Sequence, residues 1–286
     1  MTNRDSHSRI DLHLHTTCSD GTLTPEETVD EALSRGLKLI SITDHDTIRA
    51  IAPASKAAAG RDLRLLSGIE LNTDYKGQEV HVLGYGFEPE SDAMREALGV
   101  MLGGRSGRNE AILERLRALG KPVAMERVKE LAAGKVVTRP HIAKAMLEAG
   151  YVRSIQEAFD KYLKKGAPAF VERRSLTPQE ACGAILGGGG VPVLAHPGKT
   201  NFDTLFRELL TCGLRGLEVY HPDHTESDSK RFLKYARKHD LLITGGTDSH
   251  GPYSGRPVEM GSIHVPWEAG EALMEAVEAH GAHCDR

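Results

Sequence analysis

The chain has 286 residues, of which 40% are hydrophobic and 27% charged, as is ordinary for a soluble globular protein. No apolar run approaches the ~20 residues that span a membrane, and the polar amino terminus lacks the apolar stretch of a secretory signal. The net charge of −4 argues against a protein that coats nucleic acid non-specifically. The four cysteines are scattered and show no pattern of a disulfide framework. We therefore expect a cytoplasmic protein with reduced thiols, no membrane association and no obligate protein partner.

Short apolar runs alternate with helical patterns along most of the chain, which predicts βα units and a mainly parallel sheet. We place strands at residues 9–15, 37–43, 63–71, 78–84, 191–195, 214–220 and 241–245. A helix is expected between the first two strands, because Thr24, Pro25 and Glu27 form a capping box, and it should end near Gly36. Residues 177–180 repeat this pattern and predict a second crossover helix.

The strand pattern disappears between residues 91 and 174, where helical stretches such as 110–119 and 141–149 take over. We therefore expect an α/β barrel formed by residues 1–90 and 175–286, and a helical insertion at 91–174 that caps one end of it. Residues 92–174 carry 17 Lys and Arg against 10 Asp and Glu, a net charge of +7, which leaves −11 for the rest of the chain. A basic insertion would suit a substrate with more than one phosphate, although a solvated helical surface explains the charge equally well.

Histidines and carboxylates close the predicted strands before the insertion. His13 and His15 lie two residues apart at the end of the first strand, so both imidazoles leave the same face. Asp20 follows in a turn, His45 closes the second strand, and Glu70 closes the third. A buried carboxylate at the end of an apolar strand is costly unless a cation compensates it, so Glu70 indicates a metal.

The same residue types recur at the later strands, in the order His81, His196, His221, His224, Asp248 and His250. A single core histidine is unremarkable, but a histidine or carboxylate near the end of almost every strand is improbable as packing. Because the carboxyl ends of barrel strands meet at one face, the sequence predicts a metal site there. For His224, Asp44 and Asp46, a role in turns or in supporting the ligands is the favoured interpretation.

The motifs HLHTTCSDG, TDHDT, GIE, HVLGY, AHPG and TDSHG together resemble those of the polymerase and histidinol phosphatase (PHP) family. The resemblance covers nearly the whole chain and implies a distorted seven-stranded βα barrel with two or three divalent metal ions. The ligands that it implies are His13, His15, Asp20, His45, Glu70, His81, His196, Asp248 and His250, with Glu70 between two metals. Some trinuclear members have histidine at the position of Asp20. Imidazole and carboxylate ligands suit manganese, iron or zinc, of which manganese is our first expectation.

Two metals roughly 3.5 to 4 Å apart can hold a bridging hydroxide as the catalytic nucleophile, so phosphate ester hydrolysis is expected, although the same centre could hydrolyse an amide. Candidate substrate contacts are Arg105 and Arg108, which we place at a helix start, Lys135, Arg139 and His141, which surround a proline, and His224. Ordinary surface cations are the alternative interpretation of the basic residues. His221 is the candidate for phosphate contact or leaving-group protonation, with support of a ligand as the alternative.

The insertion and the TRPHIA segment resemble the PHP branch that contains nucleoside 3′,5′-bisphosphate phosphatases and 5′-to-3′ exoribonucleases. The resemblance implies a small nucleotide whose 3′-phosphate is removed to give the 5′-monophosphate, while arginines of the insertion hold the other phosphate. Short RNA is an alternative substrate, and a histidinol-phosphatase-like monoesterase is an alternative enzyme. A non-catalytic PHP module is a further alternative, although such modules usually lose ligands and every ligand position here holds a competent donor.

Overall fold

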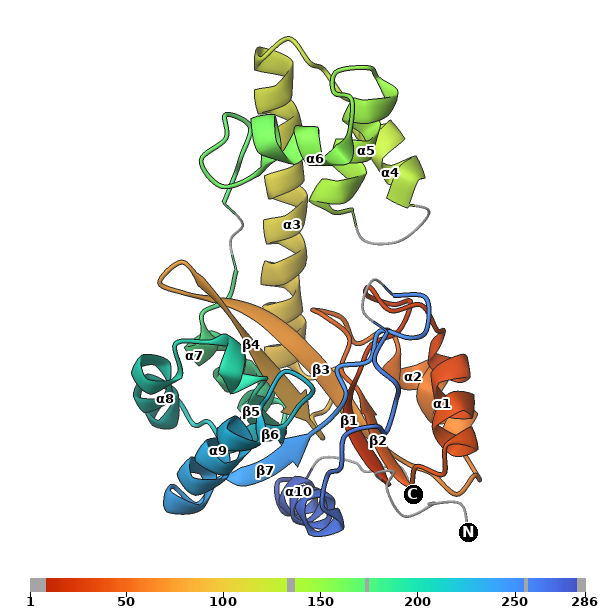
Figure 1. Cartoon of the computed structure of the whole chain (residues 1–286), viewed down its shortest axis with the longest axis vertical. Helices are drawn as coiled ribbons and strands as arrows, with labels where there is room; N and C mark the ends of the chain where they lie inside the picture. The colour runs from red at the N-terminus through yellow and green to blue at the C-terminus, as the bar shows by residue number, and fades with distance from the viewer. Residues whose placement is uncertain (1–8, 133–136, 173–174, 255–256, 282–286) are drawn as a thin grey trace. The chain divides into compact units, whose positions relative to one another are not determined.

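The computed structural model describes residues 9–132, 137–172, 175–254 and 257–281 (Figure 1). The chain divides into two compact units. The barrel unit comprises Met1–Leu98 and Leu176–Arg286, and the helical unit comprises Gly99–Ser175. No helix within the described ranges is both long and apolar enough to cross a membrane.

Among the described residues, the barrel unit contains a seven-stranded sheet whose strands neighbour one another in chain order. The strands are β1 (Ile10–Leu14), β2 (Leu39–Ile42), β3 (Arg64–Tyr75), β4 (Gln78–Tyr85), β5 (Val191–Leu194), β6 (Gly216–Tyr220) and β7 (Leu242–Gly245). A bridge from Leu14 to Ser249 joins the end of β1 to the segment after β7, so the sheet nearly closes into a barrel. The α/β barrel class is confirmed, and each expected strand lies within a few residues of an observed one.

The sheet is mainly parallel, as predicted, and it departs from a series of βα units at the hairpin formed by β3 and β4. Strands β1 to β3 are parallel, and so are β5 to β7, but β4 runs antiparallel to both of its neighbours. The turn residues Lys76 and Gly77 have φ angles of 55° and 83°. Positive φ at both positions is the type I′ geometry that matches the twist of paired strands. A two-residue turn therefore joins β3 to β4.

Helices flank the strands of the barrel unit: α1 (Pro25–Ser34), α2 (Ile51–Ala58), α7 (Pro178–Gly187), α8 (Phe202–Thr211), α9 (Glu226–Lys238) and α10 (Trp267–Ala279) (Figure 1). Both expected capping boxes are present, since Thr24 and Thr177 accept from the backbone N–H groups of Glu27 and Glu180. Gly36 has a φ of 76° just after α1, which ends that helix where the sequence predicts.

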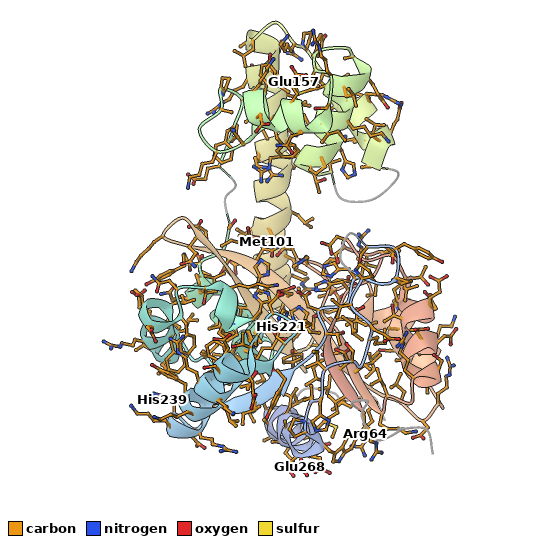
Figure 2. The ribbon with its side chains drawn as sticks, in the orientation of Figure 1. Arg64, Met101, Glu157, His221, His239 and Glu268 are labelled. Carbon is orange, nitrogen blue, oxygen red and sulfur yellow. The ribbon has the colours of Figure 1, made fainter. Side chains whose placement is uncertain are left out.

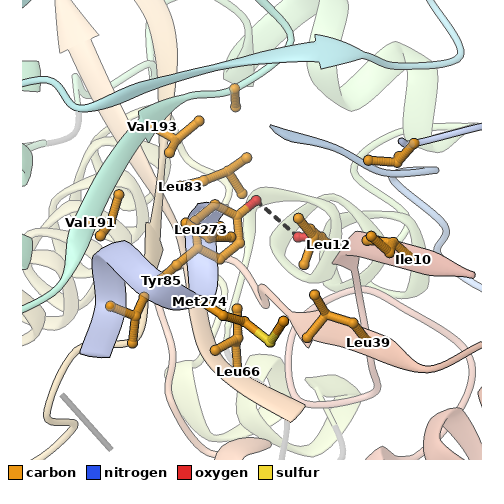
Figure 3. Close-up of a cluster of buried hydrophobic side chains, with 13 residues drawn as sticks. Ile10, Leu12, Leu39, Leu66, Leu83, Tyr85, Val191, Val193, Leu273 and Met274 are labelled. Atoms are coloured by element: carbon orange, nitrogen blue, oxygen red, sulfur yellow. Dashed lines mark hydrogen bonds between the residues drawn. The ribbon is translucent and has the colours of Figure 1, made fainter. Parts of the chain in front are cut away.

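A buried apolar cluster packs the strands of the barrel unit against α10 (Figure 3). It includes Leu12 of β1, Leu83 and Tyr85 of β4, and Leu273 of α10. The buried hydroxyl of Tyr85 donates to the carbonyl oxygen of Leu12 at 3.0 Å, and leaving such a group unpaired would cost about 1–3 kcal/mol. The cluster therefore holds β1 and β4 in fixed positions, and both strands carry candidate metal ligands.

The helical unit consists of the later turns of α3 (Asp92–Ala118) together with α4 (Met125–Ala132), α5 (Arg139–Glu148), α6 (Ile155–Ala158) and the π-helical turn η2 (Phe159–Leu163). Its own core includes the fully buried residues Ile112, Leu116 and Ile142. The unit begins at Gly99 rather than at residue 91, because the first turns of α3 belong to the barrel unit.

Arg105 and Arg108 do not lie at a helix start, contrary to the expectation from the sequence. They belong to the middle of α3, which continues through the glycine-rich segment 99–107. Each glycine costs about 1 kcal/mol relative to alanine in a helix, an amount that packing elsewhere can offset, so these glycines do not interrupt it. The positive end of the helix dipole is therefore remote from both arginines.

Candidate metal centre

The predicted ligands come from separate strands and meet in one cluster. They lie in or directly after β1 (His13, His15), after β2 (His45), in β3 (Glu70), in β4 (His81), after β5 (His196) and after β7 (Asp248, His250), and Asp20 adds one from the turn before α1. His221 follows β6 and lies among the inner side chains of the barrel unit (Figure 2). The structure thus brings together the whole set of ligands that the motifs imply.

Glu70 is the centre of the cluster, with a side chain that is only 1% exposed. Five imidazole nitrogens of described residues approach its two oxygens: Nε2 of His13, Nε2 of His15 and Nδ1 of His45 lie 3.1–3.2 Å from Oε2, and Nδ1 of His81 and Nε2 of His196 lie 2.7 and 3.0 Å from Oε1. Each oxygen therefore faces its own group of imidazoles. This arrangement suits a carboxylate placed between two cations.

Two further carboxylates complete the cluster. Oδ1 of Asp248 lies 3.5 Å from Nε2 of His13 and 3.2 Å from Nε2 of His15. Asp20 stands at the solvent side with a 57% exposed side chain, and its Oδ1 lies 3.3 Å from Nε2 of His250. The rings of His15 and His250 stack with their centroids 4.1 Å apart.

Nδ1 of His15 and Nδ1 of His196 are buried without a hydrogen-bond partner among the described residues. Such atoms are rare in folded proteins, because each costs about 1–3 kcal/mol. The lone pair of an imidazole nitrogen also binds metals. Among the described residues, ligand atoms within 4.8 Å of one another form four groups linked by shared residues: His13, His15, Glu70 and Asp248; His45, Glu70 and His81; His15, Asp20, His45 and His250; and His13, Glu218 and His221. These residues could therefore hold divalent metal ions.

The charges in the cluster shift the pKa values of its members. Burial alone would raise the pKa of Glu70, but the surrounding histidines outweigh burial and hold that pKa well below its usual range. Burial likewise lowers the pKa of His81 and His15, yet the neighbouring carboxylates prevail and raise these pKa values to about 10 and about 9. Carboxylates that attract a proton to an imidazole also attract a cation that replaces the proton.

Three residues of the site have an unusual backbone conformation. His196, Asp248 and Asp46 have φ angles of 26°, 51° and 53°. Each lies within four residues of the end of a strand, namely β5, β7 and β2. Non-glycine residues in this region cost of order 1–3 kcal/mol and persist where the surrounding structure imposes them, as it often does at functional sites.

Glu218 is a buried residue of the site that the sequence analysis missed. Its Oε1 accepts from Nδ1 of His13 at 2.8 Å, and its Oε2 accepts from the backbone N–H of His196 at 2.7 Å. A carboxylate on the far nitrogen of a ligating histidine fixes the tautomer and the orientation of the ring. The signal was available, because Glu218 stands inside the apolar run LEVY just as Glu70 stands inside its own strand.

Asp11 was also missed, although it is fully buried in β1. It accepts from the backbone N–H and the hydroxyl of Thr247 at 2.9 and 2.6 Å, and from the N–H of Gly261 at 2.9 Å. Burial raises the pKa of Asp11, and these hydrogen bonds oppose the rise. The residue ties the segment that carries Asp248 to β1.

Asp44 and Asp46 have partners that fit the supporting role favoured from the sequence. Asp44 accepts from the backbone N–H and the hydroxyl of Thr16 at 2.7 and 2.6 Å. Asp46 accepts from the backbone N–H and the side-chain amide of Asn72 at 2.8 and 2.9 Å. Both aspartates therefore fasten the segment around His45 to neighbouring strands.

His224 has backbone partners on both ring nitrogens. Its Nδ1 donates to the carbonyl oxygen of Val219 at 2.9 Å, and its Nε2 accepts from the N–H of Gly198 at 3.2 Å. His224 thus fastens the turn after β5 to the end of β6. This geometry favours the structural interpretation of His224 over the substrate contact.

A cavity of about 570 Å³ opens beside Asp248 and His250, and its lining includes His221 and Tyr253. Tyr253 is 87% exposed. The backbone N–H of Asp223 donates to Nδ1 of His221 at 3.0 Å, so the neutral ring carries its proton on Nε2. That nitrogen lies 3.4 Å from Oδ2 of Asp248. His221 therefore presents an N–H donor to the site.

Two candidate substrate contacts of the helical unit have partners inside that unit. The guanidinium of Arg139 lies 6.0 and 5.8 Å from the ring centroids of Phe159 and Phe170. Nδ1 of His141 accepts from the backbone N–H of Thr138 at 3.1 Å and so caps α5. Both side chains therefore have contacts within the helical unit.

The structure gives less information about the other candidate substrate contacts of the helical unit, Arg105, Arg108 and Lys135. Arg108 donates to Oδ1 of Asn109 at 3.3 Å. Lys135 and the side chain of Arg105 lie outside the described residues. A phosphate-binding role for these basic residues stays a prediction.

Comparison with known proteins identifies the family. A family model described as "PHP domain" matches residues 11–169, which is more than half of the chain. The chain belongs to the PHP family. The resemblance drawn from the motifs is therefore confirmed. The match begins in β1, the strand that carries His13.

Two curated relatives of this PHP protein are named for activity on nucleotides or RNA. A 3′,5′-nucleoside bisphosphate phosphatase from Chromobacterium violaceum is 32% identical over 261 residues, which cover 87% of this chain and 89% of the relative. The 5′-3′ exoribonuclease Rnm from Escherichia coli is 35% identical over 249 residues, which cover 85% of each chain. A solved structure from Bifidobacterium adolescentis, described as a metal-dependent phosphoesterase, aligns with a TM-score of 0.77 at 30% identity and covers 93% of this PHP chain and 96% of its own.

Proposed function

We propose that this PHP protein is a metal-dependent phosphoesterase that removes the 3′-phosphate of nucleoside 3′,5′-bisphosphates to give 5′-monophosphates. The observation that carries the proposal is the convergence of imidazoles from separate strands on Glu70, with Asp248 beside them. The substrate is supported by the 32% identical relative named as a 3′,5′-nucleoside bisphosphate phosphatase. Two or three divalent ions, manganese in the first place, are the cofactors that we propose.

The chain's own residues prepare the site for such ions. When bound, divalent ions would activate water and neutralise charge on the phosphate oxygens during displacement at phosphorus. Glu218 keeps the proton of His13 on Nδ1, so that the Nε2 lone pair faces the cluster. The Nε2–H of His221, which lies 3.4 Å from Oδ2 of Asp248, would be shared with a phosphate oxygen or with the leaving oxygen, because the other ring nitrogen is held by the N–H of Asp223.

A nucleotide substrate gives the exposed ring of Tyr253 a role. The side chain is 87% exposed and belongs to the cavity that opens beside Asp248. Stacking of a nucleobase on an aromatic ring contributes about 1–3 kcal/mol and tolerates any base. We place the base on Tyr253 and the 3′-phosphate at the metal centre.

A substrate panel tests the proposal. The manganese-loaded protein should hydrolyse adenosine 3′,5′-bisphosphate with a higher kcat/KM than AMP or histidinol phosphate, and the products should be AMP and inorganic phosphate. Hydrolysis of the bisphosphate no faster than that of the two monophosphates would refute the bisphosphate assignment. The Asp248→Ala variant is the control for activity from a contaminating phosphatase.

The second candidate function is 5′-to-3′ exoribonuclease activity, which the 35% identical Escherichia coli relative favours. The same centre would then cleave a phosphodiester bond at the end of a short RNA. An RNA oligonucleotide labelled at its 3′ end separates the two functions, because an exoribonuclease acting from the 5′ end yields a ladder of shortened labelled products and a bisphosphate phosphatase leaves the oligonucleotide intact.

A further inference from the structure

Lys199 places a positive charge beside the candidate metal centre, and the motifs did not single it out. It is the last residue of the short 3₁₀ helix η3 (Pro197–Lys199), three residues after His196. Its ammonium lies 2.9 Å from Oδ2 of Asp223 and 3.4 Å from Oδ2 of Asp248. Oδ1 of Asp248, on the other hand, faces His13 and the cluster. Lys199 and the ligand cluster therefore contact different oxygens of the same carboxylate.

The turn that carries Lys199 is held in place by backbone hydrogen bonds. The N–H of Lys199 donates to the carbonyl oxygen of His196 at 2.9 Å. The N–H of Gly198 donates to Nε2 of His224 at 3.2 Å, and a β-carbon at Gly198 would come within 2.8 Å of that ring. Because its backbone is fixed to a candidate ligand on one side and to β6 on the other, the charge is positioned before substrate arrives.

The ammonium has the capacity and the exposure to bind an anion. It has three N–H donors, and the described residues supply two acceptors, one oxygen each from Asp223 and Asp248. The side chain is 38% exposed. Nε2 of His221 lies 3.4 Å from the same Oδ2 of Asp248, and both His221 and Asp248 line the cavity. Two donors thus meet at one oxygen beside the space where substrate would enter.

We infer that Lys199 binds a non-bridging oxygen of the phosphoryl group that is hydrolysed. The inference rests on the proposed function and adds a residue to it. During phosphoryl transfer the charge is spread over the non-bridging oxygens, and a positioned cation stabilises that charge. If Lys199 served only to neutralise the charge of Asp223, its second contact, with Asp248, would not be needed. Loss of one preorganised donor of this kind lowers kcat by roughly 10²–10³-fold.

The test compares Lys199→Met, which keeps the aliphatic stem without the charge, with Lys199→Arg, which keeps the charge. Lys230→Met is the matched control, because Lys230 forms an exposed ion pair with Glu226 on α9. For each manganese-loaded protein, kcat and KM for adenosine 3′,5′-bisphosphate, the affinity for inorganic phosphate by calorimetry, and the metal content are measured. Lys199→Met should lose roughly 100-fold in kcat/KM and bind phosphate roughly 10-fold more weakly at unchanged metal content. Lys199→Arg should recover much of both, and Lys230→Met should behave as wild type.

Full phosphate affinity in Lys199→Met would overturn the inference even if the enzyme is the phosphatase that we propose. Loss of metal from Lys199→Met would also overturn it, because the lysine would then act only through Asp248. Lys199→Gln replaces the methionine variant if that protein does not fold. By contrast, a wild-type protein that neither binds phosphate nor hydrolyses any phosphate ester refutes the proposed function itself.

Discussion

The Glu218→Gln substitution tests whether the buried carboxylate of Glu218 holds His13 and His196 in the positions needed to bind metal. Glu218 uses both oxygens as acceptors, one for Nδ1–H of His13 and one for the backbone N–H of His196. Glutamine has nearly the same shape but only one acceptor oxygen, and its NH₂ group must face one of these donors. Either the backbone hydrogen bond of His196 is lost, or His13 moves its proton to Nε2 and can no longer ligate through that nitrogen.

The magnitude follows from the lost hydrogen bond. A buried donor left without an acceptor costs about 1–3 kcal/mol, and each kcal/mol lowers Tm by about 2–4 °C in a protein of this size. Removal of a carboxylate partner from a ligating histidine typically weakens metal binding by about 10–100-fold. We therefore expect a folded variant with a modestly lower Tm and a metal affinity reduced by about one to two orders of magnitude.

Titration of the metal-free variant with manganese against a competing chelator measures this effect. Activity should recover at high manganese concentration, because the other ligands remain. Glu226→Gln is the control, since Glu226 is an exposed residue paired with Lys230. Wild-type manganese affinity in a folded Glu218→Gln protein would refute the role that we assign to this residue.

Three further predictions concern the ligands, the substrate and pH. Asp248→Ala should abolish turnover at an unchanged circular dichroism spectrum, and retained activity would count against the assigned site. Tyr253→Ala should lower kcat/KM for the nucleotide by about 5- to 160-fold, from ~1–3 kcal/mol of stacking, without affecting ribose 3,5-bisphosphate; an equal loss on both compounds would contradict stacking. Folding raises the pKa of His15 to about 9 and the pKa of His81 to about 10. Protonation of these two histidines therefore stabilises the folded state. This stabilisation is complete below their unfolded pKa of ~6.5 and is lost as pH rises through 9 to 10. The Tm of the metal-free protein should therefore fall from pH 6.5 to 10, and a flat profile would contradict this.

The strands and the ligand set could be predicted from the sequence because each depends on a local pattern. An apolar run predicts a strand whichever neighbour that strand pairs with. A residue such as His45, which follows the run directly, must lie at the end of the strand. The cluster around Glu70 follows once the strands are in one barrel, except for His81, which lies in the first half of β4 and reaches Glu70 because that strand runs antiparallel to β3. The hairpin at Lys76 and Gly77 was overlooked because the alternating pattern predicted a mainly parallel sheet without marking the strand that runs the other way.

Other features depend on packing that a single sequence does not display. The glycines of α3 look like a helix break, and only the structure shows that the helix continues past Arg105. The partners of His224 and Arg139 lie in other segments, so a ligand-binding role and a structural role cannot be separated from sequence alone. Lys199 lies next to the AHPG motif, but its proposed role depends on its contacts with Asp223 and Asp248, which follow other strands.

The most direct test is anomalous diffraction at the manganese edge from crystals of the wild-type protein grown with manganese. The account predicts at least two anomalous peaks within coordination distance of the Glu70 carboxylate, one on each side of it, with the neighbouring imidazole nitrogens directed at them. Crystals in which manganese binds elsewhere, or not at all while the imidazoles turn away from Glu70, would contradict it.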